Sequence, residues 1–246
     1  MYKENMAEIL DLEVRVPSGL YHIPLNNYQR YMQVVEGVDV ESEESSDFLN
    51  LKALDIFCGL QLKDSYKLPM SAFNAVLEQL AKCLSEETPL VKRFTMRGTD
   101  GAQIEFGFNP NIKEMSFGEY VDLDTYIKDW KQMHKAMAVL YRPVIGSKRD
   151  MYRIEDYESS DKYADLLRYM PTSVALGALV FFYRLGMKLA KRLISSSLDQ
   201  IPLKDLSKAE SKFLEKGGVG ISHYTLLLEV MSQNLTRLQN NHYISV

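Results

Sequence analysis

The chain of 246 residues has few of the residue types that build metal and redox sites, with two cysteines and four histidines. Cys58 and Cys83 both fall in apolar helical patterns, and neither lies in a CxxC motif. A structural zinc site needs about four ligands, often in closely spaced pairs. We therefore expect two buried thiols in a reducing compartment, with a disulfide between them as the open alternative.

The sequence also lacks long apolar runs and an excess of basic charge. Its formal net charge is −4, so no overall basic field attracts nucleic acid. The most apolar stretch covers only residues 174–183, whereas a membrane-spanning helix needs about 20 apolar residues. The N-terminal MYKENMAEIL lacks the continuous apolar core of a signal peptide. We expect a soluble protein that stays in the cell in which it is made.

What the chain does contain is helical periodicity, most clearly between Met115 and Ile145. Ser116 and Glu119 form an S-x-x-E capping box, which marks a helix start. Pro143 marks its end, because the residue before a proline resists the helical conformation. Large side chains recur between these signals at spacings that place them on one helical stripe: Leu123, Tyr126, Trp130, Met133, Met137 and Leu140. The pattern predicts one central helix over residues 117–142.

The other segments predict a mostly α-helical α+β fold, in which two small β-hairpins lie beside a helical bundle. Alternating apolar residues around turn signals predict the hairpins, near residues 12–25 and 92–108. Helical spacing predicts further helices near residues 28–35, 48–62, 71–84 and 172–195. Asn26 or Asn27 is the expected cap of the first helix, and Glu41–Asp47 is expected to be an acidic loop. Gly177 and Gly186 indicate a close helix–helix approach.

The C-terminal part differs in composition from the rest. We predict a mixed α+β body over residues 1–197 and an extension over residues 198–246. Within the extension, Gly217–Gly220 predicts a hinge, and residues 222–240 predict an amphipathic helix. The apolar face of this helix requires either the body of the protein or a partner. The predicted partner-binding residues are Tyr224, Leu227, Leu228, Met231, Leu235 and Leu238.

No catalytic, cofactor-binding or metal-binding set is evident, so we predict a protein that is not an enzyme and uses no cofactor. The competing hypothesis is a metal-dependent enzyme that uses Glu119, Asp122, Asp129 and His134. Helix capping and dipole compensation explain Glu119, Asp122 and Asp124 without a metal. Moreover, Asp129 and His134 would project about 140° apart on a helix.

A basic face recurs at helical spacing near the end of the most apolar helix: Arg184, Lys188, Lys191 and Arg192. A solvated helix face is the simplest interpretation. Binding to a phosphate group or to an acidic protein surface is the alternative. If this face bound nucleic acid, the affinity would fall as salt rises.

Two segments carry a resemblance to a known group: PLNNYQRYMQ (Pro24–Gln33) and FGFNPNIKEMSFGEYVDLDTYIKDWKQMHKAMAVLYRPV (Phe106–Val144). They resemble late-gene proteins of tailed phages of Bacteroidetes, the crAss-like phages and related ones. The layout also resembles that of phage tail assembly chaperones, with a small β element, a helix after a GEYxDLD-like phrase, and further helices. The resemblance covers about residues 12–185.

The resemblance implies a non-enzymatic late protein that acts by protein–protein binding, such as a tail-assembly-chaperone-like factor. A structural virion component, either a connector ring subunit or a packaged protein, is the alternative, and a metal-dependent phage enzyme is a more distant one. The implied partners are other phage structural proteins, with a homo-oligomer left open. A membrane is excluded and nucleic acid is disfavoured. The implied location is the host cytoplasm during assembly, or the virion.

Overall fold

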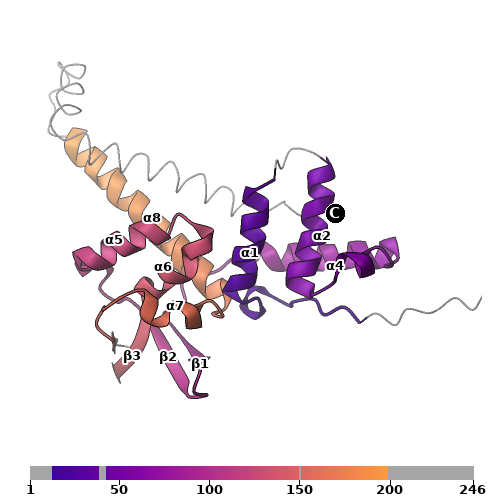
Figure 1. Cartoon of the computed structure of the whole chain (residues 1–246). Helices are drawn as coiled ribbons and strands as arrows, with labels where there is room; N and C mark the ends of the chain where they lie inside the picture. The colour runs from indigo at the N-terminus through magenta and orange to yellow at the C-terminus, as the bar shows by residue number, and fades with distance from the viewer. Residues whose placement is uncertain (1–12, 39–42, 150, 199–246) are drawn as a thin grey trace, which may run out of the picture.

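Helices dominate the structure. The computed structural model describes residues 13–38, 43–149 and 151–198, and this part is a mostly α-helical α+β fold, as predicted (Figure 1). The helices are α1 (Leu25–Glu36), α2 (Glu43–Cys58), α3 (Leu62–Ser65), α4 (Met70–Leu84), α5 (Phe117–Tyr126), α6 (Met133–Leu140), α7 (Asp161–Leu167) and α8 (Thr172–Leu198). The strands are β1 (Arg93–Arg97), β2 (Gln103–Phe108), β3 (Tyr141–Lys148) and β4 (Met151–Ile154). In Figure 1, α1 to α4 lie on one side and the strands with α5 to α8 on the other.

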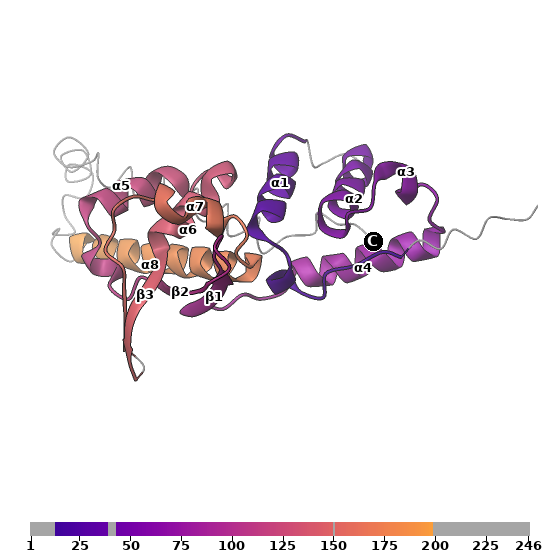
Figure 2. The ribbon, with the colours of Figure 1, turned by 60° about the horizontal axis from the view of Figure 1, so that its bottom comes forward.

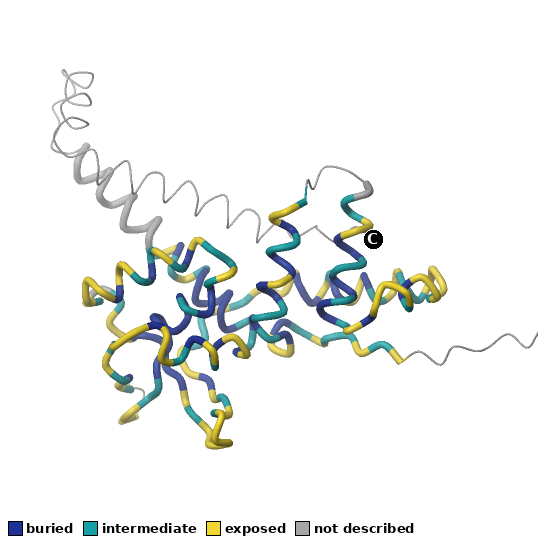
Figure 3. Tube along the Cα trace, viewed as in Figure 1, coloured by how far each residue is buried: buried dark blue, intermediate teal, exposed yellow. Residues whose placement is uncertain are grey.

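The short helix α6 lies at the centre of the fold. All of its residues are buried except Lys135, which is half-buried. It packs against α5, α7 and α1 and runs directly into β3. Its sequence, MHKAMAVL, explains this position, because a helix that is apolar on nearly all sides is stable only when neighbours cover it. Buried residues also gather at the base of the sheet, whereas the hairpin ends are exposed (Figure 3).

The prediction of one continuous helix over residues 117–142 is wrong at its middle. The helix α5 ends at Tyr126, and Asp129 adopts an extended backbone conformation. The Asp129 carboxylate accepts a hydrogen bond from the backbone N–H of Lys131 at 2.8 Å. Asp129 therefore caps a second helical segment, which begins with a 3-10 turn at Trp130–Gln132 and continues as α6.

The same prediction is wrong at its end. The helix α6 stops at Leu140, and Tyr141 begins β3. The partners of Tyr141, Arg142 and Pro143 lie in β2 over Phe106–Phe108. Pairing with a strand more than 30 residues away in sequence therefore determines the conformation of this segment, which local helical spacing cannot reveal.

The predicted N-terminal hairpin near residues 12–25 is also wrong over its described residues. Residues 13–17 form no regular structure, and Leu20–His22 forms a 3-10 turn. The Ile23 carbonyl accepts hydrogen bonds from the backbone N–H and the hydroxyl of Thr172, at 2.9 and 2.8 Å. The end of this segment thus bonds to the start of α8 and forms no strand with residues 13–17.

Two helix starts differ from the predicted ones. Neither Asn26 nor Asn27 caps α1, which begins after Pro24. The N–H groups of Leu25 and Asn26 donate instead to the carbonyls of Met170 and Arg168, at 2.9 and 2.8 Å, so no side-chain cap is needed. The residues from Glu43 to Asp47, predicted to be part of a loop, belong to α2.

The four strands form one antiparallel sheet in the order β1-β2-β3-β4. The hairpin β1–β2 lies where the sequence predicts one, and Gly101 in its turn has φ +83°, a value suited to glycine. The second hairpin is β3–β4, which projects from the body (Figure 2). Rings at the sheet base pack against α7 and α8, since Phe106 contacts Tyr163 and Phe108 contacts Phe181.

The two sides of the molecule share one hydrophobic core. A Cβ added at Gly177 would lie 2.3 Å from the Pro89 carbonyl oxygen. The close approach predicted at Gly177 is therefore real, but the neighbour is the extended segment between α4 and β1 rather than a helix.

Candidate functional site

Glu119, the first carboxylate of the hypothetical metal set, has two structural partners. Its carboxylate accepts from the Ser116 N–H at 2.7 Å, and the Ser116 hydroxyl accepts from the Glu119 N–H at 3.2 Å. This is the predicted capping box. The other carboxylate oxygen lies 2.7 Å from Nη2 of Arg142, and both side chains are nearly fully buried. The Glu119–Arg142 pair therefore joins α5 to β3.

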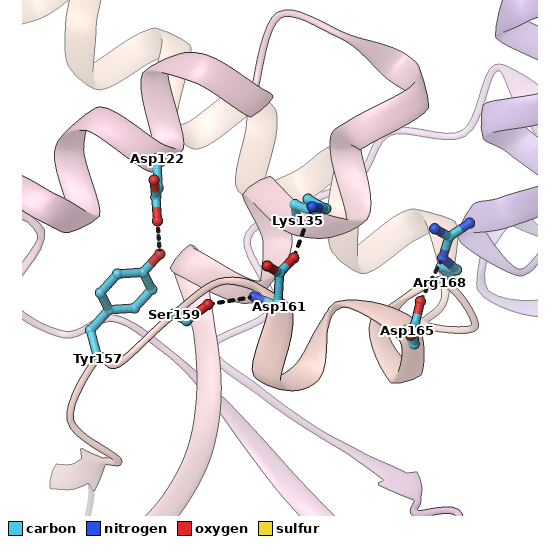
Figure 4. Close-up of polar contacts among 7 residues, drawn as sticks. All are labelled: Asp122, Lys135, Tyr157, Ser159, Asp161, Asp165 and Arg168. Atoms are coloured by element: carbon cyan, nitrogen blue, oxygen red, sulfur yellow. Dashed lines mark hydrogen bonds and ion pairs between the residues drawn. The ribbon is translucent and has the colours of Figure 1, made fainter.

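The other two carboxylates of that set, Asp122 and Asp129, also have separate partners, and so does the neighbouring Asp124. Asp122 accepts a hydrogen bond from the Tyr157 hydroxyl (Figure 4), and burial followed by this bond raises the pKa of Tyr157. Asp124 forms an exposed ion pair with Lys128 at 2.9 Å. Asp129 caps the 3-10 turn before α6, as described above.

His134 lies on α6, facing α1. Its Nδ1 is 3.1 Å from the Gln29 amide nitrogen, which also donates to the Trp130 carbonyl at 2.5 Å. Because Nδ1 accepts, the ring proton lies on Nε2, which is buried and has no hydrogen-bond partner among the described residues. Burial, followed by the charges of Arg168 and Lys135, lowers the pKa of His134 to about 4. A neutral histidine thus links α1 to α6.

The residues proposed for a metal site are therefore not brought together. Within residues 13–38, 43–149 and 151–198, no group of three or more His, Cys, Asp or Glu side chains is placed to hold a metal ion. The metal-dependent enzyme hypothesis requires these four side chains to lie together, and in this part of the chain they do not.

A polar cluster that the sequence did not indicate lies between α6 and α7 (Figure 4). Lys135 Nζ is 2.8 Å from Asp161, and Arg168 Nε is 3.1 Å from Asp165. The Ser159 hydroxyl accepts from the Asp161 N–H at 3.1 Å. The hydrogen bond to Asp161 raises the pKa of Lys135. The Lys135–Asp161 pair therefore joins α6 to the start of α7, whereas the Asp165–Arg168 pair lies at the end of α7.

The two cysteines are free thiols. Cys83 is buried and Cys58 is half-buried. Burial raises the pKa of each thiol to about 11, and for Cys83 the charge of Glu86 adds to this effect. Both are therefore protonated and weakly nucleophilic at neutral pH.

Of the four residues of the predicted basic face, the structure describes the side chain of Arg184. Arg184 is exposed on α8. The side chains of Lys188, Lys191 and Arg192 lie outside the described set, so the interpretation of this face stays a prediction. The described residues likewise do not include the predicted hinge at Gly217–Gly220 or the predicted partner-binding residues, which are Tyr224, Leu227, Leu228, Met231, Leu235 and Leu238. The predicted boundary between residues 197 and 198 lies within α8, which includes Leu198.

Residues of α2 and α3 line a groove of about 500 Å³. These two helices lie at the end of the molecule away from the strands (Figure 2). Its lining residues are Asp47, Phe48, Leu51, Lys52, Asp55, Gln61, Leu62 and Tyr66. Helix α2 buries its opposite face, including Leu49 and Leu54, in the core. The groove therefore lies on the outer face of a helix that the core already holds in place.

Apolar side chains in this groove are open to solvent. Phe48 is 43% exposed, Leu62 53% and Tyr66 75%. Charged groups accompany them, with Lys52 Nζ lying 5.7 Å from the centre of the Phe48 ring and with Asp47 and Asp55 also in the lining. The groove therefore combines exposed apolar side chains with charged groups at its edge.

The sequence predicted a helix in this segment but gave no sign of the groove. Phe48 and Leu51 share the helical spacing of the buried Leu54 and Phe57. A spacing of three drifts about 60° around a helix at each step, so Phe48 and Phe57 lie on opposite faces of α2. The spacing alone did not show which of these faces meets the core.

Comparison of the chain with protein-family models, with curated proteins and with solved structures finds no match in any of the three. None of the helices in the described part of the chain combines the length and the hydropathy that a membrane-spanning segment needs.

Proposed function

We propose that this chain is a non-enzymatic phage assembly protein, similar to tail assembly chaperones, that binds an apolar segment of another phage structural protein. The observation that carries the proposal is the groove between α2 and α3, where Phe48, Leu62 and Tyr66 are exposed together. The resemblance of Pro24–Gln33 and Phe106–Val144 to late phage proteins supplies the biological setting. The host cytoplasm during assembly is the corresponding location.

The mechanism follows from the chemistry of the groove. Burial of a large apolar side chain contributes about 1.5–3 kcal/mol, so a few anchors from a partner helix can supply useful affinity. Asp47, Lys52 and Asp55 are placed to select partners by charge. The C-terminal stripe, Tyr224 to Leu238, is the second binding surface in this proposal.

The test is co-expression with the phage tail proteins, the tape-measure protein first, followed by affinity capture. Leu62→Asp should weaken capture about tenfold or more, because it places a charge in the apolar groove. Met70→Asp is the matched control, since Met70 is 72% exposed on α4 and does not line the groove. Equal capture by both variants would remove the groove from the proposal.

A second experiment separates the assembly factor from the virion component. Mass spectrometry of infected cells and of purified particles gives the copy number in each. An assembly factor should be abundant in cells and missing from particles. A stoichiometric, symmetric count in particles would instead identify a structural component of the virion.

A further inference from the structure

We infer that a second copy of this chain binds in the groove between α2 and α3, and that helix α5 is the part of that copy which enters. The contact joins two unlike surfaces, so the copies associate head to tail. The inference rests on the proposed function only in using the same groove, because association between copies needs no other phage protein. A phage partner competes with the second copy for this groove.

The outer face of α5 carries exposed apolar side chains, which we call the α5 ridge. Phe117 is 83% exposed and Val121 42%, and Tyr120 beside them is 41% exposed. Glu119 and Leu123, on the other side of the helix, are buried. The ridge residues recur at i, i+3 and i+4, the spacing with which an amphipathic helix enters an apolar groove.

The α5 ridge and the groove lie at opposite ends of the molecule. In Figure 2, α5 lies at one end and α3 at the other, and Figure 1 likewise separates α5 from α2. Since both ends belong to one packed core, a chain cannot place its own α5 in its own groove. A contact between unlike surfaces of two copies leaves one surface free at each end, so it repeats until a ring closes or a filament forms.

The two surfaces are similar in length. On α2, the lining of the groove runs from Asp47 to Asp55, a rise of about 12 Å along a helix. On α5, the distance from Phe117 to Asp124 is about 10 Å on the same basis. The ridge therefore fits along the groove without extending far beyond it.

The charges of the two surfaces are complementary. In the groove, Lys52 lies in sequence between two lining carboxylates, Asp47 and Asp55. The α5 ridge is followed by the Asp124–Lys128 ion pair, whose side chains are partly exposed. When Asp124 lies against Lys52, Lys128 comes close to a carboxylate of the groove. Such exposed pairs add little affinity, but they favour one orientation of the helix. This match of spacing, length and charge is the reason for choosing a second copy as the occupant.

The contact between two copies is small. Helix α5 has 10 residues, and a single short helix buries less than the roughly 1,200 Å² of total surface at which specific, stable complexes begin. We therefore expect association that depends on concentration in the micromolar range or above, about −8 kcal/mol or weaker.

Sedimentation velocity of the full chain over a concentration series tests the inference. Two variants each change one surface, Phe117→Asp on the α5 ridge and Leu62→Asp in the groove. Met151→Asp is the matched control, since Met151 is 72% exposed on β4 and belongs to neither surface. The wild-type chain and the control should gain mass beyond a dimer as concentration rises, whereas each surface variant should self-associate about tenfold or more weakly.

A mixture of the two surface variants distinguishes a head-to-tail contact from a symmetric one. The Phe117→Asp chain keeps its groove and the Leu62→Asp chain keeps its ridge, so the mixture should form a one-to-one complex that grows no further. A wild-type chain that stays monomeric would overturn the inference, and so would a mixture that stays monomeric or a surface variant that associates as well as the wild type. Val121→Asp and Tyr66→Asp replace the first two variants if either folds poorly by circular dichroism.

The co-expression experiment separates this inference from the proposed function. The Phe117→Asp chain should still capture the phage partner, because its groove is unchanged. If the wild-type chain captured no phage protein while its copies associated head to tail, the proposed function would be rejected and this inference would stand. Capture by a chain whose copies never associate would leave the proposed function standing and reject this inference.

Discussion

At the scale of single residues, Gly177 shows how one missing side chain permits a contact. Gly177→Ala should lower the free energy of unfolding by about 1–3 kcal/mol, because its Cβ would meet the Pro89 carbonyl oxygen at 2.3 Å. This cost exceeds the gain in helix propensity of about 1 kcal/mol. Urea denaturation followed by circular dichroism measures the difference.

Gly118→Ala is the matched control for this prediction. A Cβ at Gly118 meets no heavy atom of the described residues within 4 Å outside its own turn of α5. This variant should be neutral or more stable by up to about 1 kcal/mol. If both alanine variants were stabilised equally, the contact between Pro89 and α8 would be wrong.

His134 should make the stability of the protein depend on pH. Its pKa is about 4 in the folded state and about 6.5 in an unfolded chain. Between these values the unfolded state binds the proton and the folded state does not, so stability falls as pH falls from about 6.5 to 4. The slope contributed by His134 approaches about 1.4 kcal/mol per pH unit.

A variant identifies the source of that slope. His134→Gln removes the titrating ring but keeps an amide that can bond to Gln29. The variant should be less stable at pH 7 and should show a weaker decline between pH 6.5 and 4. Identical slopes in the two proteins would show that groups other than His134 cause the dependence.

At the scale of secondary-structure elements, the Glu119–Arg142 pair holds α5 against β3. Glu119→Gln should cost about 3–5 kcal/mol, because it leaves the Arg142 charge buried without its partner. The double variant Glu119→Gln/Arg142→Met should cost less than the sum of the two single changes. Chemical denaturation of all four proteins gives the coupling energy.

The exposed pair Asp124–Lys128 on the same helix is the comparison. Its side chains are partly open to solvent, so Asp124→Asn should cost no more than about 1 kcal/mol. A similar cost for Glu119→Gln and Asp124→Asn would mean that the Glu119–Arg142 pair is not buried in solution.

Local signals predicted those elements that local interactions determine. The capping box at Ser116, the hairpin turn around Gly101 and the helix that became α4 all depend on residues within a few positions of one another. The missed features depend on distant partners. Tyr141 is in a strand because it pairs with β2, and Ile23, in the predicted N-terminal hairpin, bonds instead to Thr172 at the start of α8.

The same distinction applies to the candidate site. The sequence correctly indicated Glu119 as a helix-capping residue, but it could not show the ion pair with Arg142, which arises from the packing of α5 on β3. The groove was not predictable either, because the sequence does not show which face of α2 meets the core and which face carries Phe48.

At the scale of the whole molecule, the helices α1 to α4 and the part that contains the strands share their core. Trp130, the single tryptophan of the chain, packs beside α6 with its ring 5.3 Å from that of Tyr28 on α1. Gln29 bonds across the same boundary to Trp130 and His134. The helices that form the groove therefore pack, through α1, against the part of the fold that contains the strands.

This shared core predicts a single cooperative unfolding transition. Trp130 fluorescence reports on the boundary between α1 and α6, whereas far-ultraviolet circular dichroism reports on all the helices. The two signals should change at the same urea concentration with the same slope, because neither side can keep its core after the other unfolds. If the fluorescence changed first while most of the helical signal remained, the boundary would be weaker than the cores on either side. In that case, a partner bound in the groove should shift only the later unfolding transition, which the circular dichroism signal reports. If unfolding is cooperative, the bound partner should raise the urea midpoints of both signals together.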